Sequence, residues 1–177
     1  MSALELAFSV EPVTGWRIWR VSREIDRARS AHELAVELLA AEQRGEVGAV
    51  ARLFEPRLRS LTELGFWPAR ERMTAACGRG SAHTPPQAAC ECGVWAFRAY
   101  ERAYAELLAY AHGATPVVLG RVRMWGRLVE AEHGWRAQYA YPADLTVFGA
   151  EDEVAPALEA AYGVPVVAAP WPSQQAA

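Results

Sequence analysis

The clearest pattern along the chain is an alternation of apolar and polar side chains over residues 117–130 and again from residue 135. A period of two is typical of a strand that turns one face to a core and the other to solvent. Glu-His-Gly at 132–134 supplies the turn, so the pattern predicts a β-hairpin whose second strand runs from residue 135 to Pro142, and residues 145–148 are predicted as a further strand. Gly120 and Gly126 lie inside the first strand and predict sharp bending, as in a small curled sheet or barrel.

Other short segments rich in β-branched and aromatic residues are predicted as strands. They cover residues 13–21, 58–64, 94–97 and 164–167. Residues 58–64 also fit a helix, and a strand is the preferred interpretation.

Helical periodicity marks three longer segments. They cover residues 30–44, 99–112 and 151–162. The first opens with a capping box, in which Ser30 and Glu33 satisfy free backbone N–H groups, and Gly45 stands at its C-terminal cap. Its alanines and leucines, among them Leu39, form one apolar stripe. A shorter helical piece is predicted at 47–54.

Length and composition are those of an ordinary globular domain. The 177 residues are 52% apolar and 22% charged, and the net charge of −3 argues against non-specific binding of nucleic acid. We expect a single domain over residues 1–167 with a helical insertion at about 27–55, and a disordered tail at 168–177. The first ten residues lack a targeting signal and no stretch reaches the roughly 20 apolar residues of a membrane span, so we expect a cytoplasmic protein.

Residues 65–93 are irregular and rich in glycine and proline. So long a segment without secondary structure is uncommon in a compact domain and usually needs a staple. All three cysteines of the chain lie inside it, in the pattern Cys77-x5-His83-x6-Cys90-x-Cys92. Three thiolates and one imidazole are a donor set of structural zinc sites, and clustered cytoplasmic cysteines fit a metal better than a disulfide. The sequence therefore predicts one structural zinc ion on these four residues.

Other interpretations of the same residues stay open. They could be reduced cysteines and a surface histidine, or the cysteines could hold an iron–sulfur cluster. If His83 were not a ligand, a three-cysteine site with Glu71 or Glu91 as general base would leave a position for a catalytic water. The zinc-deaminase pattern, H-x-E with P-C-x-x-C, is not met, because Thr84-Pro85 follows His83 and no C-x-x-C is present.

Arginine and tryptophan gather on the predicted hairpin and beside the cysteines. The candidate ligand-binding residues are Trp67, Trp95, Arg121, Arg123, Trp125, Arg127 and Trp135. Arginines interleaved with aromatic rings suit a nucleic acid, another anion or a flat ligand. The simpler interpretation is that the tryptophans pack in the core while the hairpin arginines, Arg136 included, pair with glutamates on a solvated face.

Several segments share a further likeness. They are Trp67-Pro68 through Cys77, His83-Thr-Pro-Pro, Cys90-Glu-Cys-Gly-Val-Trp-Ala, residues 117–129 and residues 134–142. They resemble a family of small uncharacterised Cys/His-containing proteins common in high-GC actinobacteria, over about two thirds of the chain. The resemblance implies that the Cys/His set and the hairpin form one core unit and that the helix at 30–45 is an insertion. It implies no activity.

Together these features predict one α+β domain: a small curled antiparallel sheet or partial barrel with a zinc-stapled loop and flanking helices. The expected function is a non-catalytic, zinc-stabilised binding or adaptor module. A nucleic-acid reader that uses aromatic stacking and arginine contacts is one alternative, and a zinc-dependent hydrolytic enzyme is another. A protein is the expected partner, with nucleic acid less favoured and no membrane.

Overall fold

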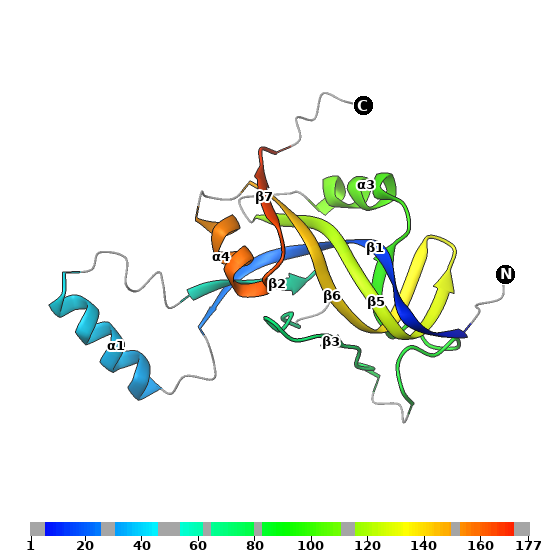
Figure 1. The fold of residues 1–177 in the computed structure, drawn as a ribbon, viewed down its shortest axis with the longest axis horizontal. Coiled ribbons are helices and arrows are strands. Elements are labelled where there is room, and N and C mark those ends of the chain that lie inside the picture. The colour runs from blue at the N-terminus through cyan, green and yellow to red at the C-terminus, as the bar shows by residue number, and fades with distance from the viewer. Residues whose placement is uncertain are drawn as a thin grey trace.

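The computed structural model describes residues 6–25, 31–45, 54–61, 65–79, 83–110, 116–149 and 153–171. Its elements are β1 (Leu6–Ile25), α1 (Ala31–Gln43), β2 (Phe54–Ser60), β3 (Met73–Thr74), β4 (Val94–Phe97), α3 (Tyr100–Tyr110), β5 (Val117–Ala131), β6 (Gly134–Phe148), α4 (Val154–Tyr162) and β7 (Val166–Ala169). Figure 1 shows the long strands β1, β5 and β6 side by side and strongly curved through the middle of the molecule. The prediction of an α+β fold with a curled sheet is confirmed.

The sheet curls until β4 lies beside β1, its neighbour in the strand order β2-β1-β4-β6-β3. β5 pairs with β1 on one side and β6 on the other, while β4 pairs with β6 along its length and with β1 through Trp16 and Phe97. The strands β1, β5, β6 and β4 therefore close into a small ring. The sheet is mixed and not wholly antiparallel as predicted, because β7 runs parallel to β6 after the turn of α4.

The predicted hairpin is present as β5 and β6, and its bends lie at breaks in the pairing. One register shift spans Trp125 to Leu128 and contains Gly126, whose φ of 79° is unfavourable for any other residue. A Cβ at this position would also lie 2.8 Å from a ring carbon of Tyr139. A second shift between Arg121 and Val122 lets β6 run on through Pro142 as one strand.

The core has one part on each face of the sheet, as the alternation along β5 requires. Val118, Val122 and Met124 pack with α4 and with Trp19, while Val117 and Leu119 pack with α3. Phe148 at the end of β6 stacks on Trp171, with 6.5 Å between ring centroids. Residues 168–171 therefore belong to the folded part, contrary to the predicted tail, and 172–177 lie outside the described residues.

Helices α3 and α4 match their predicted segments, and α1 lies within its own. β1 and β2 are antiparallel neighbours whose last paired residues are Ile25 and Phe54, and α1 lies in the connection between these two strands. Leu39, which was predicted to belong to an apolar stripe, is 59% exposed, and α1 stands away from the sheet (Figure 1).

Ser30 and residues 47–53 lie outside the described residues, and β2 begins earlier than the strand predicted at 58–64. Among the described helices none is long and apolar enough to cross a membrane.

A buried hydroxyl joins α4 to β2 and to the segment that follows. The Tyr162 hydroxyl accepts a hydrogen bond from the Leu58 backbone N–H at 3.0 Å and donates one to the Trp67 carbonyl at 2.8 Å. Burial raises the pKa of Tyr162 to about 12. Its ionisation is therefore easier in the unfolded chain, so the tyrosine stabilises the fold below about pH 10, and this contribution is lost as the pH rises toward 12.

Replacing Tyr162 with phenylalanine is expected to lower the free energy of unfolding by about 1–3 kcal/mol at neutral pH, since the Leu58 N–H and the Trp67 carbonyl lose their partner. Urea unfolding of both proteins at about pH 8 and about pH 11 checks the assignment. The difference between them should shrink at the higher pH, and a constant difference would contradict the raised pKa.

Candidate metal centre

The four predicted ligands come together at one point. Cys77 follows β3, Cys90 and Cys92 precede β4, and the ligand atoms of all four residues, His83 included, lie within 4.8 Å of one another. All four side chains are half-buried. They lie close enough to bind a metal ion.

One distance within the cluster equals that expected between two ligands of a tetrahedral zinc ion. The Sγ atoms of Cys77 and Cys90 are 3.8 Å apart. Two sulfurs at about 2.3 Å from zinc in a tetrahedron lie about 3.8 Å from each other, whereas a disulfide needs about 2.05 Å. His83 Nε2 lies 3.1 Å from Cys92 Sγ, somewhat closer than the about 3.6 Å that the same geometry requires. The donor set, three sulfurs and one imidazole nitrogen, is soft and suits zinc better than magnesium or calcium.

The surroundings of the cluster raise the pKa of one of its thiols. Burial raises the pKa of the Cys92 thiol, a backbone hydrogen bond from Gln87 opposes the shift, and the neighbouring Cys90 raises the pKa further. Three thiolates at this spacing repel one another, and a divalent cation among them reverses the balance because it stabilises each thiolate.

A buried arginine on β6 supports the loop, and its predicted place on a solvated face is wrong. Arg136 on β6 was expected on a solvated face but is 3% exposed. Its Nη1 donates hydrogen bonds to the carbonyl oxygens of Gln87 at 3.3 Å and of Cys92 at 3.2 Å, and also to that of Cys90. Its guanidinium carbon lies 5.2 Å from the ring centroid of Trp95. The pairing of β4 with β6 places Arg136 opposite Trp95, and this register cannot be predicted from the residues near Arg136 in the sequence.

The charge of Arg136 also fits a metal site. A buried guanidinium is costly unless an opposite charge offsets it. A divalent ion bound to three thiolates and a neutral imidazole carries one net negative charge, and the guanidinium is hydrogen-bonded to carbonyls of the same loop. The loop and the arginine are therefore electrostatically complementary when a metal is bound.

The other candidate residues do not form one site. On β5 the side chains of Arg121, Arg123 and Arg127 are exposed and alternate with buried ones, as predicted, and Trp125 is half-buried between them. Arg121 is paired with Asp144 at 2.6 Å, as expected of a solvated face.

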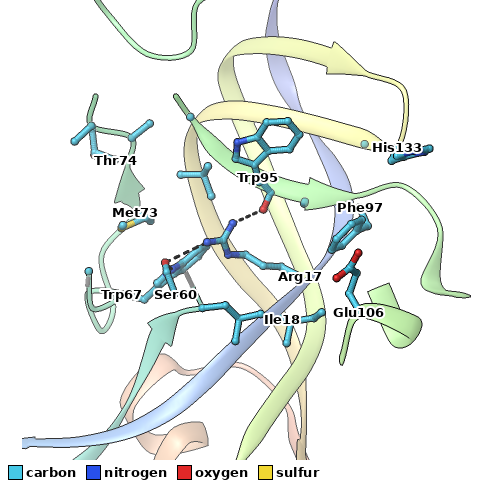
Figure 2. A pocket seen from close by; sticks show the side chains of 18 of the residues that line it. Arg17, Ile18, Ser60, Trp67, Met73, Thr74, Trp95, Phe97, Glu106 and His133 are labelled. Atoms are coloured by element: carbon cyan, nitrogen blue, oxygen red, sulfur yellow. Dashed lines mark hydrogen bonds between the residues drawn. The ribbon is translucent and has the colours of Figure 1, made fainter. Parts of the chain in front are cut away.

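The remaining tryptophans lie elsewhere. Trp135 is half-buried beneath the guanidinium of Arg98, at 5.1 Å from its ring centroid. Trp67 is only 1% exposed and packs edge to face on Trp19, whereas Trp95 is 45% exposed. Trp67 and Trp95 both line one cavity beside the metal loop (Figure 2).

Comparison of the chain with protein-family models, with curated proteins and with solved structures gives no match.

Proposed function

We propose that the protein is a non-catalytic binding or adaptor module whose Cys/His loop is held against the sheet by one structural zinc ion. The observation that carries the proposal is the convergence of Cys77, His83, Cys90 and Cys92, with their ligand atoms within 4.8 Å of one another. Arg136 adds a second support, because it ties the carbonyls of the same loop to β6.

A structural role is favoured over a hydrolytic one. Four protein donors complete a tetrahedral shell, whereas a catalytic zinc keeps one position for water. Both carboxylates considered as general bases are exposed, and Glu91 is also paired with Arg79 at 3.1 Å. Neither is among the residues that line the neighbouring cavity.

The zinc would order a long connection together with the hydrogen bonds from Arg136. The loop joins β3 to β4, and Gly93 beside the last ligand has a φ of 122°, with a virtual Cβ 3.0 Å from Cβ atoms of both Arg136 and Pro86. A residue with a side chain would therefore be strained at position 93, where the loop meets the sheet. Fixing the loop fixes Trp95, whose ring N–H donates to the Glu91 carbonyl at 3.0 Å.

The outer face of β5 is the proposed contact surface for a protein partner. It presents Arg123, Arg127 and the half-buried Trp125, and arginine and tryptophan are enriched in protein interfaces. The net charge of −3 favours a protein over a nucleic acid. Trp125→Ala and Arg123→Glu should each weaken any captured protein complex by tenfold or more, and an interaction that survives both changes would move the surface elsewhere.

The metal shell itself can be measured directly. Elemental analysis of the purified protein should give one zinc per chain, and X-ray absorption at the zinc edge should give three sulfurs at about 2.3 Å and one nitrogen at about 2.0–2.1 Å. An oxygen in the first shell in place of the nitrogen would indicate an open position and support the hydrolytic alternative.

A further inference from the structure

A cavity of about 470 Å³ opens beside the metal loop, between β1, β2, β4 and α3. This volume lies within the range of small-molecule sites, about 300–1,000 Å³. One wall comes from the residues that flank the metal ligands, namely Ala75 and Ala76 before Cys77 and Gly93 to Trp95 after Cys92. Figure 2 shows Arg17 from β1 reaching into the middle of this space.

The polar end of the cavity offers donors. Arg17 donates from Nη2 to the Ser60 hydroxyl oxygen at 3.1 Å and from Nη1 to the Trp95 carbonyl, and its guanidinium carbon lies 5.1 Å from the ring centroid of Trp67. The group is therefore fixed by hydrogen bonds and by stacking before a ligand arrives. An arginine held in this way is suited to a planar anion.

Ser60 makes the end of the cavity selective. It is 3% exposed, and its oxygen accepts hydrogen bonds from Arg17 at 3.1 Å and from the Trp67 ring N–H at 3.3 Å. A hydroxyl has two lone pairs and one proton, so both acceptor positions are taken. Within the described residues no acceptor receives the Ser60 proton, so the hydroxyl can serve a ligand only as a donor. Arg17 and Ser60 together call for a group that only accepts, such as a carboxylate.

Most of the other residues that line the cavity are apolar, and several of them are aromatic. Trp67, Trp95 and Phe97 contribute rings, and Met73 and Ile18 fill the spaces between them. Three ionisable side chains besides Arg17 also line the cavity, namely Glu106, Tyr110 and His133. Glu106 lies 3.9 Å from Arg102, and His133 lies 3.9 Å from Glu132. Aromatic walls favour a ligand ring, which can stack or pack edge-on against them.

We propose that this cavity binds a small planar aromatic carboxylate, with the carboxylate on Arg17 and Ser60 and the ring between Trp95 and Phe97. This inference deepens the proposed function, because the metal loop supplies one wall and anchors Trp95. The two groups proposed to hold the carboxylate, Arg17 and Ser60, come from β1 and β2 and are not among the four metal-binding candidates.

Calorimetric titration with naphthoate and with the neutral naphthylmethanol tests the inference, using the full chain with its zinc content measured in each sample. The wild type should bind naphthoate at least tenfold more tightly than naphthylmethanol. Arg17→Met should remove this preference, Arg17→Lys should restore part of it, and Trp95→Leu should weaken both ligands. Arg20→Met, an exposed arginine on the same strand, is the matched control and should change neither affinity.

The outcomes separate the two proposals. Equal affinity for both probes, or a preference that survives Arg17→Met, overturns the carboxylate site whatever the zinc content is. The absence of binding by zinc-loaded wild type also overturns the site and leaves the structural zinc intact. Binding that depends on Arg17 in a protein without zinc supports the site and removes the proposed function. Thermal unfolding of each variant shows that a lost affinity does not come from a lost fold.

Discussion

Replacing both Cys90 and Cys92 with serine is expected to abolish zinc binding and to lower the midpoint of thermal unfolding by roughly 10 °C or more. Structural zinc contributes about 10–16 kcal/mol in zinc-finger peptides, as much as the whole stability of a typical domain. Each kcal/mol corresponds to about 2–4 °C for a chain of this length. The loss should fall on the connection between β3 and β4, which has little secondary structure of its own.

Zinc content by elemental analysis and unfolding followed by circular dichroism check this result. Glu91→Gln is the matched control, because Glu91 lies between the two cysteines and is exposed. It should keep one zinc per chain and the wild-type midpoint. A double serine variant that keeps its midpoint would show that the metal is not a staple. A wild-type protein without zinc would return the cysteines to the role of ordinary half-buried side chains.

Arg136→Met is expected to have the second largest effect. It removes the hydrogen bonds to the carbonyls of Gln87, Cys90 and Cys92 and should cost about 3–5 kcal/mol, as losses in buried polar networks do. It also removes the positive charge beside a site that would be anionic with zinc bound. The affinity for zinc should therefore fall by about 10–100-fold, the usual cost of losing a group that supports metal ligands.

Competition with a zinc-binding dye measures the affinity, and urea unfolding measures the stability. Arg136→Lys keeps the charge but not the planar fork, so it should recover part of the zinc affinity and less of the stability. Arg20→Met, at an exposed position, should stay within about 0.5 kcal/mol of wild type. If Arg136→Met matched that control in both measurements, the arginine would have no supporting role.

The elements that the sequence predicted well are those whose signals are local. The alternation along 117–130 depends only on neighbouring residues, and β5 follows it with exposed arginines and buried apolar side chains. The bend at Gly126 could be predicted in the same way, since a positive φ is a property of one residue. The helices at 100–110 and 154–162 likewise follow from the periodicity of their apolar residues.

The errors concern partners that are distant in sequence. Arg136 resembles the other hairpin arginines along the chain, and only the pairing of β6 with β4 carries it beneath the metal loop. Leu39 resembles a core residue by its spacing, yet α1 lies in the connection between β1 and β2 and leaves it exposed. β7 could not be known as a parallel strand, because its orientation follows from where α4 returns the chain.

The sequence by itself pointed to Cys77, His83, Cys90 and Cys92 as candidate metal ligands, because the chemistry and spacing of these side chains can be read from the order of residues, and the structure places them close enough to bind a metal ion. The sequence also determined the hairpin that forms most of the sheet. Only the tertiary structure decided that β4 closes the ring on β1, that Arg136 is buried below the loop, and that Arg17, Ser60 and Trp95 meet in one cavity. The physical reason is that these contacts depend on the register and curvature of the whole sheet, to which every strand contributes and which no single segment encodes.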